Sequence, residues 1–350
     1  MSRVGPPSEF ELKAGIARLL APISRKAAWF QPDKQHLLLH RTAGGREAPV
    51  TTRAEWQRRR REIIAAMLRV MGSPPPARSL KAGRFEVLSE EALPQFTQLR
   101  LSVSSPDGDP VPAWLLIPRW LPGKAPAVLC LHQTTPLGKD EPAGLGGNPN
   151  LHYARELAEL GFITLTPDYP NFGDYQTDPY ALGYASATMK GIVNHRAALD
   201  ALASLPAVDA RRLGVMGHSL GGHNALFLAA FDSRVKAVVV SCGFNSFFKY
   251  QGGDLSGWSH AGYMPRIAHE FGAEPGQMPF DFTEVLASVA PRAVFINAPV
   301  GDDNFEVSGV HDCVVAARPV YQLFGQSDRL VLETPDAGHE FPPETRQRAY

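Results

Sequence analysis

Between residues 127 and 333 the chain alternates short, continuously apolar runs with longer helical stretches. The apolar runs are 127–131, 162–166, 213–216, 235–241, 293–297 and 330–333, and helical patterns cover 151–160, 187–205 and 223–230. Strands that are apolar on both faces and alternate with helices are typical of a parallel sheet covered on both sides. The pattern therefore predicts an α/β fold with a mostly parallel central sheet and helices on both faces.

Two further segments complete this main domain, which we expect to span residues 84–350. Residues 97–104 and 111–117 flank the turn-rich 105–110 and predict a hairpin, which would form an antiparallel amino-terminal edge of the sheet. Residues 242–285 break the alternation with Gly, Trp, Tyr, Phe and Pro. We interpret them as an inserted loop or cap segment over the carboxyl ends of the strands, where loops commonly build pockets.

The first 83 residues differ from the rest and predict a helical amino-terminal extension packed on the main domain. Trp56, Ile63, Met67 and Met71 recur at helical spacing, and 72–76, Gly-Ser-Pro-Pro-Pro, would end that helix. Four consecutive arginines, 58–61, fall on the same helix. We interpret them as a solvated helix face rather than as a basic docking site.

Charge and cysteine content limit the function classes. The chain has 35 Lys plus Arg and 35 Asp plus Glu, so it has no net charge to attract nucleic acid or an anionic membrane. Its 3 cysteines form no even disulfide framework and have no zinc-site spacing. We expect no cofactor and no metal, and a cytoplasmic location unless a secretion leader has been removed. A homo-oligomer remains open.

A motif typical of a nucleophilic serine lies at 217–221. Gly217-x-Ser219-x-Gly221 follows an apolar strand and opens a helix, which is the context that this motif requires. So tight a turn strains the serine backbone and needs small neighbours. Ser219 is the predicted nucleophile.

A serine hydroxyl needs a base, and His339 follows the last strand in Gly338-His339-Glu340-Phe341-Pro342. His218 and His223, which flank the nucleophile, fit this role less well.

The acid that orients the base should follow the preceding strand. Asp302 is our choice in the loop 300–305, with Asp303 as the alternative and Glu306 third. Asp336 is interpreted as a turn former.

Two backbone N–H groups should bind the oxyanion of an acyl-transfer intermediate. We expect them from Leu220, which follows the nucleophile, and from Gln133 in the loop after 127–131. Candidates for the substrate pocket, each also readable as a core residue, are His132, His218, Tyr169, Trp258 and Tyr263.

The serine turn, the His132-Gln133 loop and the Gly-His-x-Phe-Pro ending resemble the α/β-hydrolase superfamily, in its dienelactone hydrolase and acetyl xylan esterase-like branch. The resemblance covers about residues 85–345 and implies ester hydrolysis through an acyl-enzyme without a metal. Two departures stand against it: dienelactone hydrolases typically have cysteine where this chain has Ser219, and the acetyl xylan esterase signatures before the nucleophile are not clearly present.

The predicted function is hydrolysis of a small-molecule or carbohydrate ester by Ser219, His339 and Asp302. A peptidase or amidase with the same triad is the nearest alternative. A catalytically silent binding protein of the same fold is the second.

Overall fold

The computed structural model describes residues 33–42, 46–79 and 83–350, and within them one large sheet organises the molecule. Its 9 strands run in the order β11-β10-β9-β8-β6-β7-β5-β4-β3. The pairs from β11 to β7 are parallel, whereas β7, β5, β4 and β3 pair antiparallel. This arrangement confirms the predicted mostly parallel sheet with an antiparallel amino-terminal edge.

The strands of the large sheet are β3 (Phe85–Ala92), β4 (Phe96–Ser104), β5 (Pro110–Pro118), β6 (Ala125–Leu131), β7 (Ile163–Pro167), β8 (Val208–His218), β9 (Val235–Ser241), β10 (Ala293–Asn297) and β11 (Leu330–Glu333). The α-helices are α2 (Arg53–Met71), α3 (Tyr153–Glu159), α4 (Ala187–Ser204), α5 (Leu220–Phe231), α6 (Arg266–His269), α7 (Phe282–Val289), α8 (Val307–Leu323) and α9 (Pro343–Ala349). Short 3-10 turns occupy Gly138–Asp140, Pro149–Leu151, Tyr250–Gly253, Ser256–Trp258, Pro275–Gln277 and Ser327–Arg329.

Both faces of the central strands β6 and β8 are covered toward their carboxyl ends, as consecutive residues show because their side chains point to opposite sides of the sheet. Leu129 of β6 and Val215 of β8 belong to the large core that also holds residues of α4, α5 and α8. The next residue of each strand, Cys130 and Met216, points to the other face. There it packs with residues of α3 and with Phe341, which precedes α9. The continuously apolar strands of the sequence are thus explained by helices on both faces.

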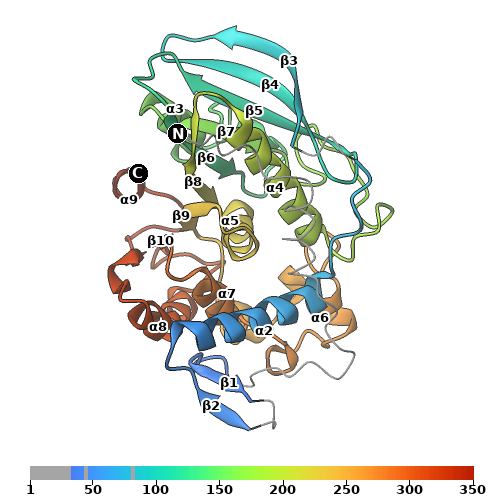
Figure 1. The fold of residues 1–350 in the computed structure, drawn as a ribbon, viewed down its shortest axis with the longest axis vertical. Helices are drawn as coiled ribbons and strands as arrows, with labels where there is room; N and C mark the ends of the chain where they lie inside the picture. Colours follow the sequence, from blue (N-terminus) through green and yellow to red (C-terminus); the bar gives the residue numbers. More distant parts are fainter. Residues whose placement is uncertain (1–32, 43–45, 80–82) are drawn as a thin grey trace, which may run out of the picture.

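The described part of the amino-terminal segment contains α2 and a small sheet that the sequence did not predict. Strands β1 (Leu39–Arg41) and β2 (Glu47–Pro49) pair antiparallel beyond α2, away from the large sheet (Figure 1). Helix α2 begins with a capping box between Thr52 and Glu55. The predicted apolar stripe of α2 is completely buried, and residues 1–32 of the proposed extension lie outside the described part.

The interpretation of the four arginines as a solvated face is wrong for two of them. Arg59 is 1% exposed and forms a buried ion pair with Glu284 at the start of α7. Arg60 donates to the carbonyls of Ser288 at 2.7 Å and Ala230 at 2.5 Å. Only Arg58 and Arg61 are exposed. Charge patterning missed this because a buried arginine needs a carboxylate partner that lies far away in the sequence.

Residues 242–285 form an irregular segment between β9 and α7, with short 3-10 turns and the four-residue α6. Phe244, Phe247, Met264 and Phe280 are buried within it. These side chains belong to the same apolar core as the large sheet, which fixes the shape of the segment without regular secondary structure.

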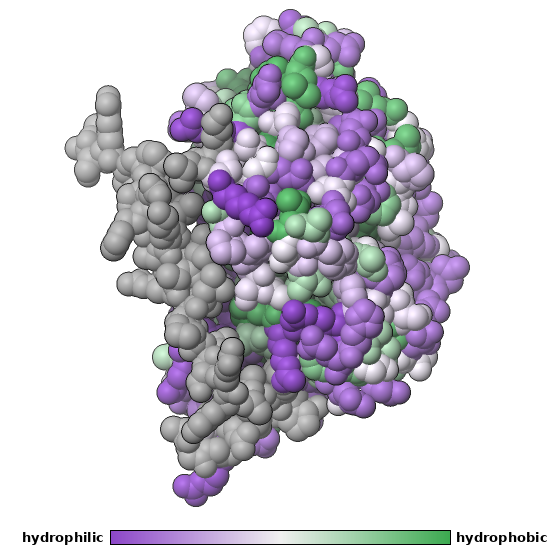
Figure 2. Space-filling model, turned by 90° about the vertical axis from the view of Figure 1, so that its right-hand side faces the viewer, coloured by the Kyte–Doolittle hydropathy of each residue, from purple (hydrophilic) through white to green (hydrophobic). Residues whose placement is uncertain are grey.

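The surface shown in Figure 2 mixes hydrophilic residues with small groups of apolar ones. Trp120, at 86%, is the most exposed large apolar side chain among the described residues. No helix in the described ranges is long and apolar enough to cross a membrane.

Candidate active site

Ser219 sits at the turn between β8 and α5, with backbone angles that few residues other than glycine adopt. Its φ is 53° and its ψ is −118°. The Ser219 N–H donates to the Ser241 carbonyl at 2.8 Å, and the N–H of His223 donates to the Ser219 carbonyl at 3.0 Å. Strain of this kind persists where the surrounding structure imposes it, and it is concentrated at functional sites.

The glycines around Ser219 let three backbone segments approach each other. A Cβ at Gly221 would lie 1.9 Å from the Leu131 carbonyl oxygen, at the end of β6. A Cβ at Gly217 would lie 2.3 Å from the Gly221 carbonyl carbon, and one at Gly222 would lie 2.8 Å from the Ser241 carbonyl oxygen. The serine turn therefore packs directly on the ends of β6 and β9, and only glycine fits these positions.

His339 lies on the loop after β11, and Asp302 lies on the loop after β10. The Nδ1 atom of His339 is 3.0 Å from Oδ1 and 3.1 Å from Oδ2 of Asp302. The Asp302 side chain is buried, whereas that of His339 is 24% exposed. Burial acts to raise the pKa of Asp302, but hydrogen bonds from His339, Phe305 and Asn304 and the charge of His339 hold it below its ordinary value.

The other acidic candidates lie elsewhere. Asp303 is exposed, and its carboxylate has no hydrogen bond to a described residue. Glu306 is exposed too, and its carboxylate accepts a hydrogen bond from Ser308. Asp336 is exposed on the loop that leads to His339. Of the carboxylates considered, Asp302 alone contacts the imidazole of His339.

The Ser219 hydroxyl forms no hydrogen bond with a described residue, and Ser219 is 8% exposed. The His339 ring nevertheless packs against the ring of His218, the residue before Ser219, with 4.8 Å between ring centroids. Contacts between nucleophile and base are often long in unliganded enzymes and shorten when substrate binds. The ring contact places His339 against the residue that precedes Ser219.

The backbone N–H groups of Leu220 and Gln133 have no acceptor among the described residues. Neither Leu220 nor Gln133 donates its backbone N–H to another described residue. Leu220 is the first residue of α5, where helix N–H groups have no partner within the helix. The contact between Gly221 and Leu131 brings the two loops that carry these donors together. The arrangement suits an anion such as a developing oxyanion.

His132 holds the Gln133 loop in place. Its Nδ1 lies 2.6 Å from the Gln133 carbonyl, and its Nε2 accepts the N–H of Tyr169 at 2.9 Å. Burial lowers the pKa of His132 to about 4, so the ring is neutral. The Tyr169 hydroxyl in turn donates to the Gly262 carbonyl at 3.0 Å. With both ring nitrogens bonded to backbone, His132 has a structural role.

A buried polar network holds the loop that carries His339. Asn297 Nδ2 donates to Ser241 Oγ at 2.8 Å and to the Glu340 carbonyl at 2.9 Å. Ser241 Oγ also lies 2.8 Å from Nδ1 of His218. Burial, followed by the neighbouring charge of His339, lowers the pKa of His218 to about 3. The network fixes residue 340 and therefore limits where His339 can move.

The Glu340 side chain ties the same loop to the rim of the site. Both of its carboxylate oxygens accept from Asn148 Nδ2 at 3.1 Å. The Asn148 N–H donates to Glu141, and Glu141 also accepts from Gln133 Nε2 at 2.9 Å. A chain of hydrogen bonds thus links the loop of Gln133 to the loop of His339.

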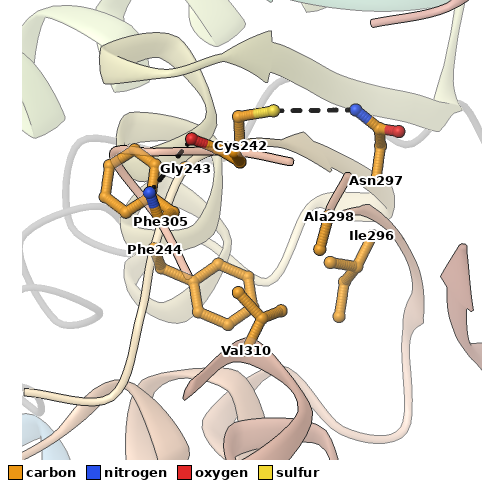
Figure 3. A pocket seen from close by; sticks show the side chains of 9 residues that line it. Cys242, Gly243, Phe244, Ile296, Asn297, Ala298, Phe305 and Val310 are labelled. Carbon is orange, nitrogen blue, oxygen red and sulfur yellow. Dashed lines mark hydrogen bonds between the residues drawn. The ribbon is translucent and has the colours of Figure 1, made fainter. Parts of the chain in front are cut away.

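A narrow gap lined by Asp302, Cys242 and Asn297 lies beside the loop that follows β10. In Figure 3 the thiol of Cys242 and the amide of Asn297 face each other on its wall, 3.8 Å apart. The gap is too narrow for a water molecule and is mostly apolar, so it is a packing gap beside Asp302 rather than a substrate pocket.

Two of the aromatic pocket candidates, Trp258 and Tyr263, lie in the segment 242–285. Trp258 is buried, stacks on His223 at 4.9 Å and contacts Tyr250 and Phe305. Tyr263 is partly exposed and meets Trp258 edge-on at 5.4 Å. Phe305 also contacts His339, at 5.8 Å between ring centroids. The aromatic cluster therefore extends from the segment 242–285 to His339.

Ser241 and Asn297 were not predicted to belong to the site. Each is the last residue of an otherwise mainly apolar strand, β9 and β10 respectively. Such a polar residue at the carboxyl end of a buried strand was the available signal, because that edge of an α/β sheet is where ligands bind.

Two known families match this chain. Residues 111–251 match the dienelactone hydrolase family, and residues 185–325 match the family described as glucuronyl esterase, fungi. Each match covers part of the sheet and includes Ser219.

Among curated proteins, YtaP of Bacillus subtilis, which is named as a hydrolase, is 26% identical over 295 residues, covering 80% of this chain and 94% of YtaP. A glucuronoyl esterase from Solibacter usitatus superposes with a TM-score of 0.65 at 20% identity, covering 90% of this chain and 95% of that one. A glucuronoyl esterase of carbohydrate esterase family 15 from Caldicellulosiruptor kristjansonii gives a TM-score of 0.65 at 21% identity, covering 91% and 89%. At these identities the two solved structures show the shared fold.

Proposed function

Because this chain is an α/β-hydrolase of the dienelactone hydrolase-like esterase branch, we propose that it cleaves carboxylic esters with Ser219, His339 and Asp302 as its catalytic triad. The observation that carries the proposal is the hydrogen bond between His339 and Asp302 beside the strained Ser219. A buried carboxylate on Nδ1 fixes the tautomer in which Nε2 accepts the serine proton.

The reaction begins when Ser219 Oγ attacks the ester carbonyl and His339 takes its proton. Asp302 stabilises the imidazolium, and the N–H groups of Leu220 and Gln133 bind the oxyanion. His339 then protonates the leaving alcohol, which leaves an acyl group on Ser219. Water activated by the same imidazole releases the acid and restores the hydroxyl.

Within this function we propose a carbohydrate ester as the substrate class. The support is the match to a glucuronyl esterase family and the likeness to two glucuronoyl esterases. The polar rim formed by Asn148 and Glu340 suits a hydroxyl-rich ligand, since amide and carboxylate groups bind hydroxyls.

We place this activity in the cytoplasm. The support is that Cys130, Cys242 and Cys313 are all unpaired, as is usual in a reducing compartment.

The proposal is tested with purified protein and matched substrates. We expect turnover of p-nitrophenyl acetate and no turnover of the corresponding p-nitroanilide, and the reverse preference would make the protein an amidase. A benzyl ester of glucuronic acid and an acetylated xylose are then compared. Hydrolysis of the first indicates that the sugar supplies the carboxylic acid of the ester, and hydrolysis of the second indicates that the sugar supplies the hydroxyl. Ser219→Ala should abolish every activity without changing the thermal unfolding midpoint.

A catalytically silent protein of this fold would give a different result. It would bind a carbohydrate ester without hydrolysing it, and wild type and Ser219→Ala would then have the same binding constant and no turnover.

A further inference from the structure

Three metal-binding side chains converge beside the serine turn. His218 ends β8, Cys242 follows β9, and His339 lies on the loop after β11. One donor atom from each lies within 4.8 Å of the other two. The three residues come from parts of the chain that only the parallel sheet brings together.

Each of the three residues keeps one donor atom with no hydrogen bond shorter than 3.5 Å to a described residue, namely the Cys242 sulfur and the Nε2 atoms of His218 and His339. The Cys242 sulfur has long contacts, 3.5 Å to the Glu340 carbonyl and 3.8 Å to Ser241 and Asn297, and it also lies near the carboxylate of Asp302. His218 uses Nδ1 toward Ser241 Oγ, so with Nδ1–H as donor its Nε2 keeps a lone pair. A partner on the second ring nitrogen is the usual support for a metal-bound histidine.

We propose that His218, Cys242 and His339 form a zinc-binding site whose occupation switches the enzyme off. Two imidazole nitrogens and one thiolate suit Zn²⁺, with a fourth position for water or a product carboxylate. Tetrahedral zinc needs neighbouring donors about 3.3–3.8 Å apart, given Zn–N and Zn–S bonds of about 2.0 and 2.3 Å. The donors therefore approach each other on binding, and rotation of the partly exposed His339 side chain, on a backbone that stays in place, supplies the movement.

Inhibition follows from either ring nitrogen of His339 and rests on the proposed role of this residue as the base. Zinc on Nε2 occupies the atom that would accept the serine proton. Zinc on Nδ1 displaces Asp302 from its present partner. In both cases the thiol proton of Cys242 passes to solvent when the thiolate binds the metal.

The first test measures ester hydrolysis by the full chain against Zn²⁺ concentration, with reversal by EDTA. Wild type should be inhibited reversibly, and Cys242→Ser should keep its activity and need at least about tenfold more zinc. Cys313→Ser is the matched control, because Cys313 is a buried thiol on α8. It should be inhibited like wild type. Equal zinc sensitivity of Cys242→Ser and wild type overturns the proposal.

A second test does not depend on turnover. Zinc bound at equilibrium, measured by competition with a chromophoric chelator, should be one per chain in wild type and in Ser219→Ala. Tight binding should be lost in Cys242→Ser. If wild type hydrolyses no ester but binds zinc in this way, the zinc site stands and the proposed function fails; if wild type binds no zinc, the site is refuted.

Cobalt covers the case in which Cys242→Ser does not fold. Co²⁺ bound to a thiolate gives a charge-transfer band in the near ultraviolet, and we expect it in wild type, Cys130→Ser and Cys313→Ser. Absence of the band from wild type, or its loss in either control variant, contradicts ligation by Cys242.

Discussion

His339 and Asp302, 37 residues apart in sequence, meet with Nδ1 of the imidazole 3.0 and 3.1 Å from the two carboxylate oxygens. Both oxygens share the ring nitrogen, and Oδ1 also accepts the N–H groups of Asn304 and Phe305. Hydrogen bonds from its own loop therefore fix the carboxylate of Asp302, independently of its contact with the imidazole. Such an arrangement orients a base without freezing it, because His339 itself stays partly exposed.

Asp302→Asn should lower kcat for p-nitrophenyl acetate by about 10³- to 10⁴-fold, because the amide favours the wrong tautomer of His339. Asp303→Asn is the matched control one residue away, and its exposed side chain should leave kcat within about twofold of wild type. A larger loss in the Asp303 variant than in the Asp302 variant would reassign the acid.

Asn297→Ala should lower kcat about 10- to 100-fold with little change in KM, because the Glu340 carbonyl loses its donor and His339 is less precisely placed. Two lost hydrogen bonds should also reduce the free energy of unfolding by about 1–3 kcal/mol. Asn304→Ala, whose side chain has no hydrogen bond to a described residue, is the control. Asn297 would be merely structural if the variant lost stability and kept its kcat.

Arg59→Ala should reduce the free energy of unfolding by about 3 kcal/mol or more, because it leaves part of the charge of buried Glu284 without its partner. Lys34 also pairs with Glu284, at 3.2 Å, and limits the loss. Arg58→Ala removes an exposed arginine from the same helix and should cost less than about 0.5 kcal/mol. Urea unfolding of both variants measures the difference, and equal values would contradict the buried role of Arg59.

Acid should destabilise the fold through four buried neutral histidines. Burial lowers the pKa of His132 to about 4 and those of His195, His218 and His223 to about 3, against 6.5 for the free side chain. The unfolded chain thus binds more protons below pH 6.5, so stability is lost as pH falls from 6.5 toward these values. Each of these histidines lowers the free energy of unfolding by roughly 1.4 kcal/mol for every pH unit of acidification in that range.

His223→Phe isolates one of these protons. The ring of His223 lies among Phe227, Trp258 and Tyr263, and neither of its nitrogens has a hydrogen-bond partner among the described residues. A phenyl ring fits the same surroundings and does not titrate. Urea midpoints measured from pH 7.5 to 4.5 should fall less steeply in the variant, by one proton, and a slope identical to wild type would rule out this role.

The main features of the fold were predictable because they are local patterns. Alternating apolar runs and helices predict the parallel sheet covered on both faces. Gly217 and Gly221 indicate the tight serine turn, because only glycine fits where the backbone segments approach so closely. The order of Ser219, Asp302 and His339 along the chain also follows from the positions of the strands.

What could not be predicted depends on contacts between distant residues. The burial of Arg59 requires Glu284, 225 residues away, and the network around Asn297 joins the ends of β8, β9 and β10 with the loop of residue 340. Asp302 and Asp303 have the same side chain and adjacent positions. Only the direction of the loop places the first against His339 and the second in solvent.

Covalent labelling with a fluorophosphonate shows whether Ser219 is a nucleophile activated by His339. Peptide mass mapping should find one phosphonate per chain, on Ser219, in wild type and none in Ser219→Ala. The labelling rate should fall by on the order of 10³-fold in His339→Ala. If wild type stays unmodified, Ser219 is not the nucleophile, and if the His339→Ala variant is labelled as fast as wild type, His339 does not activate it.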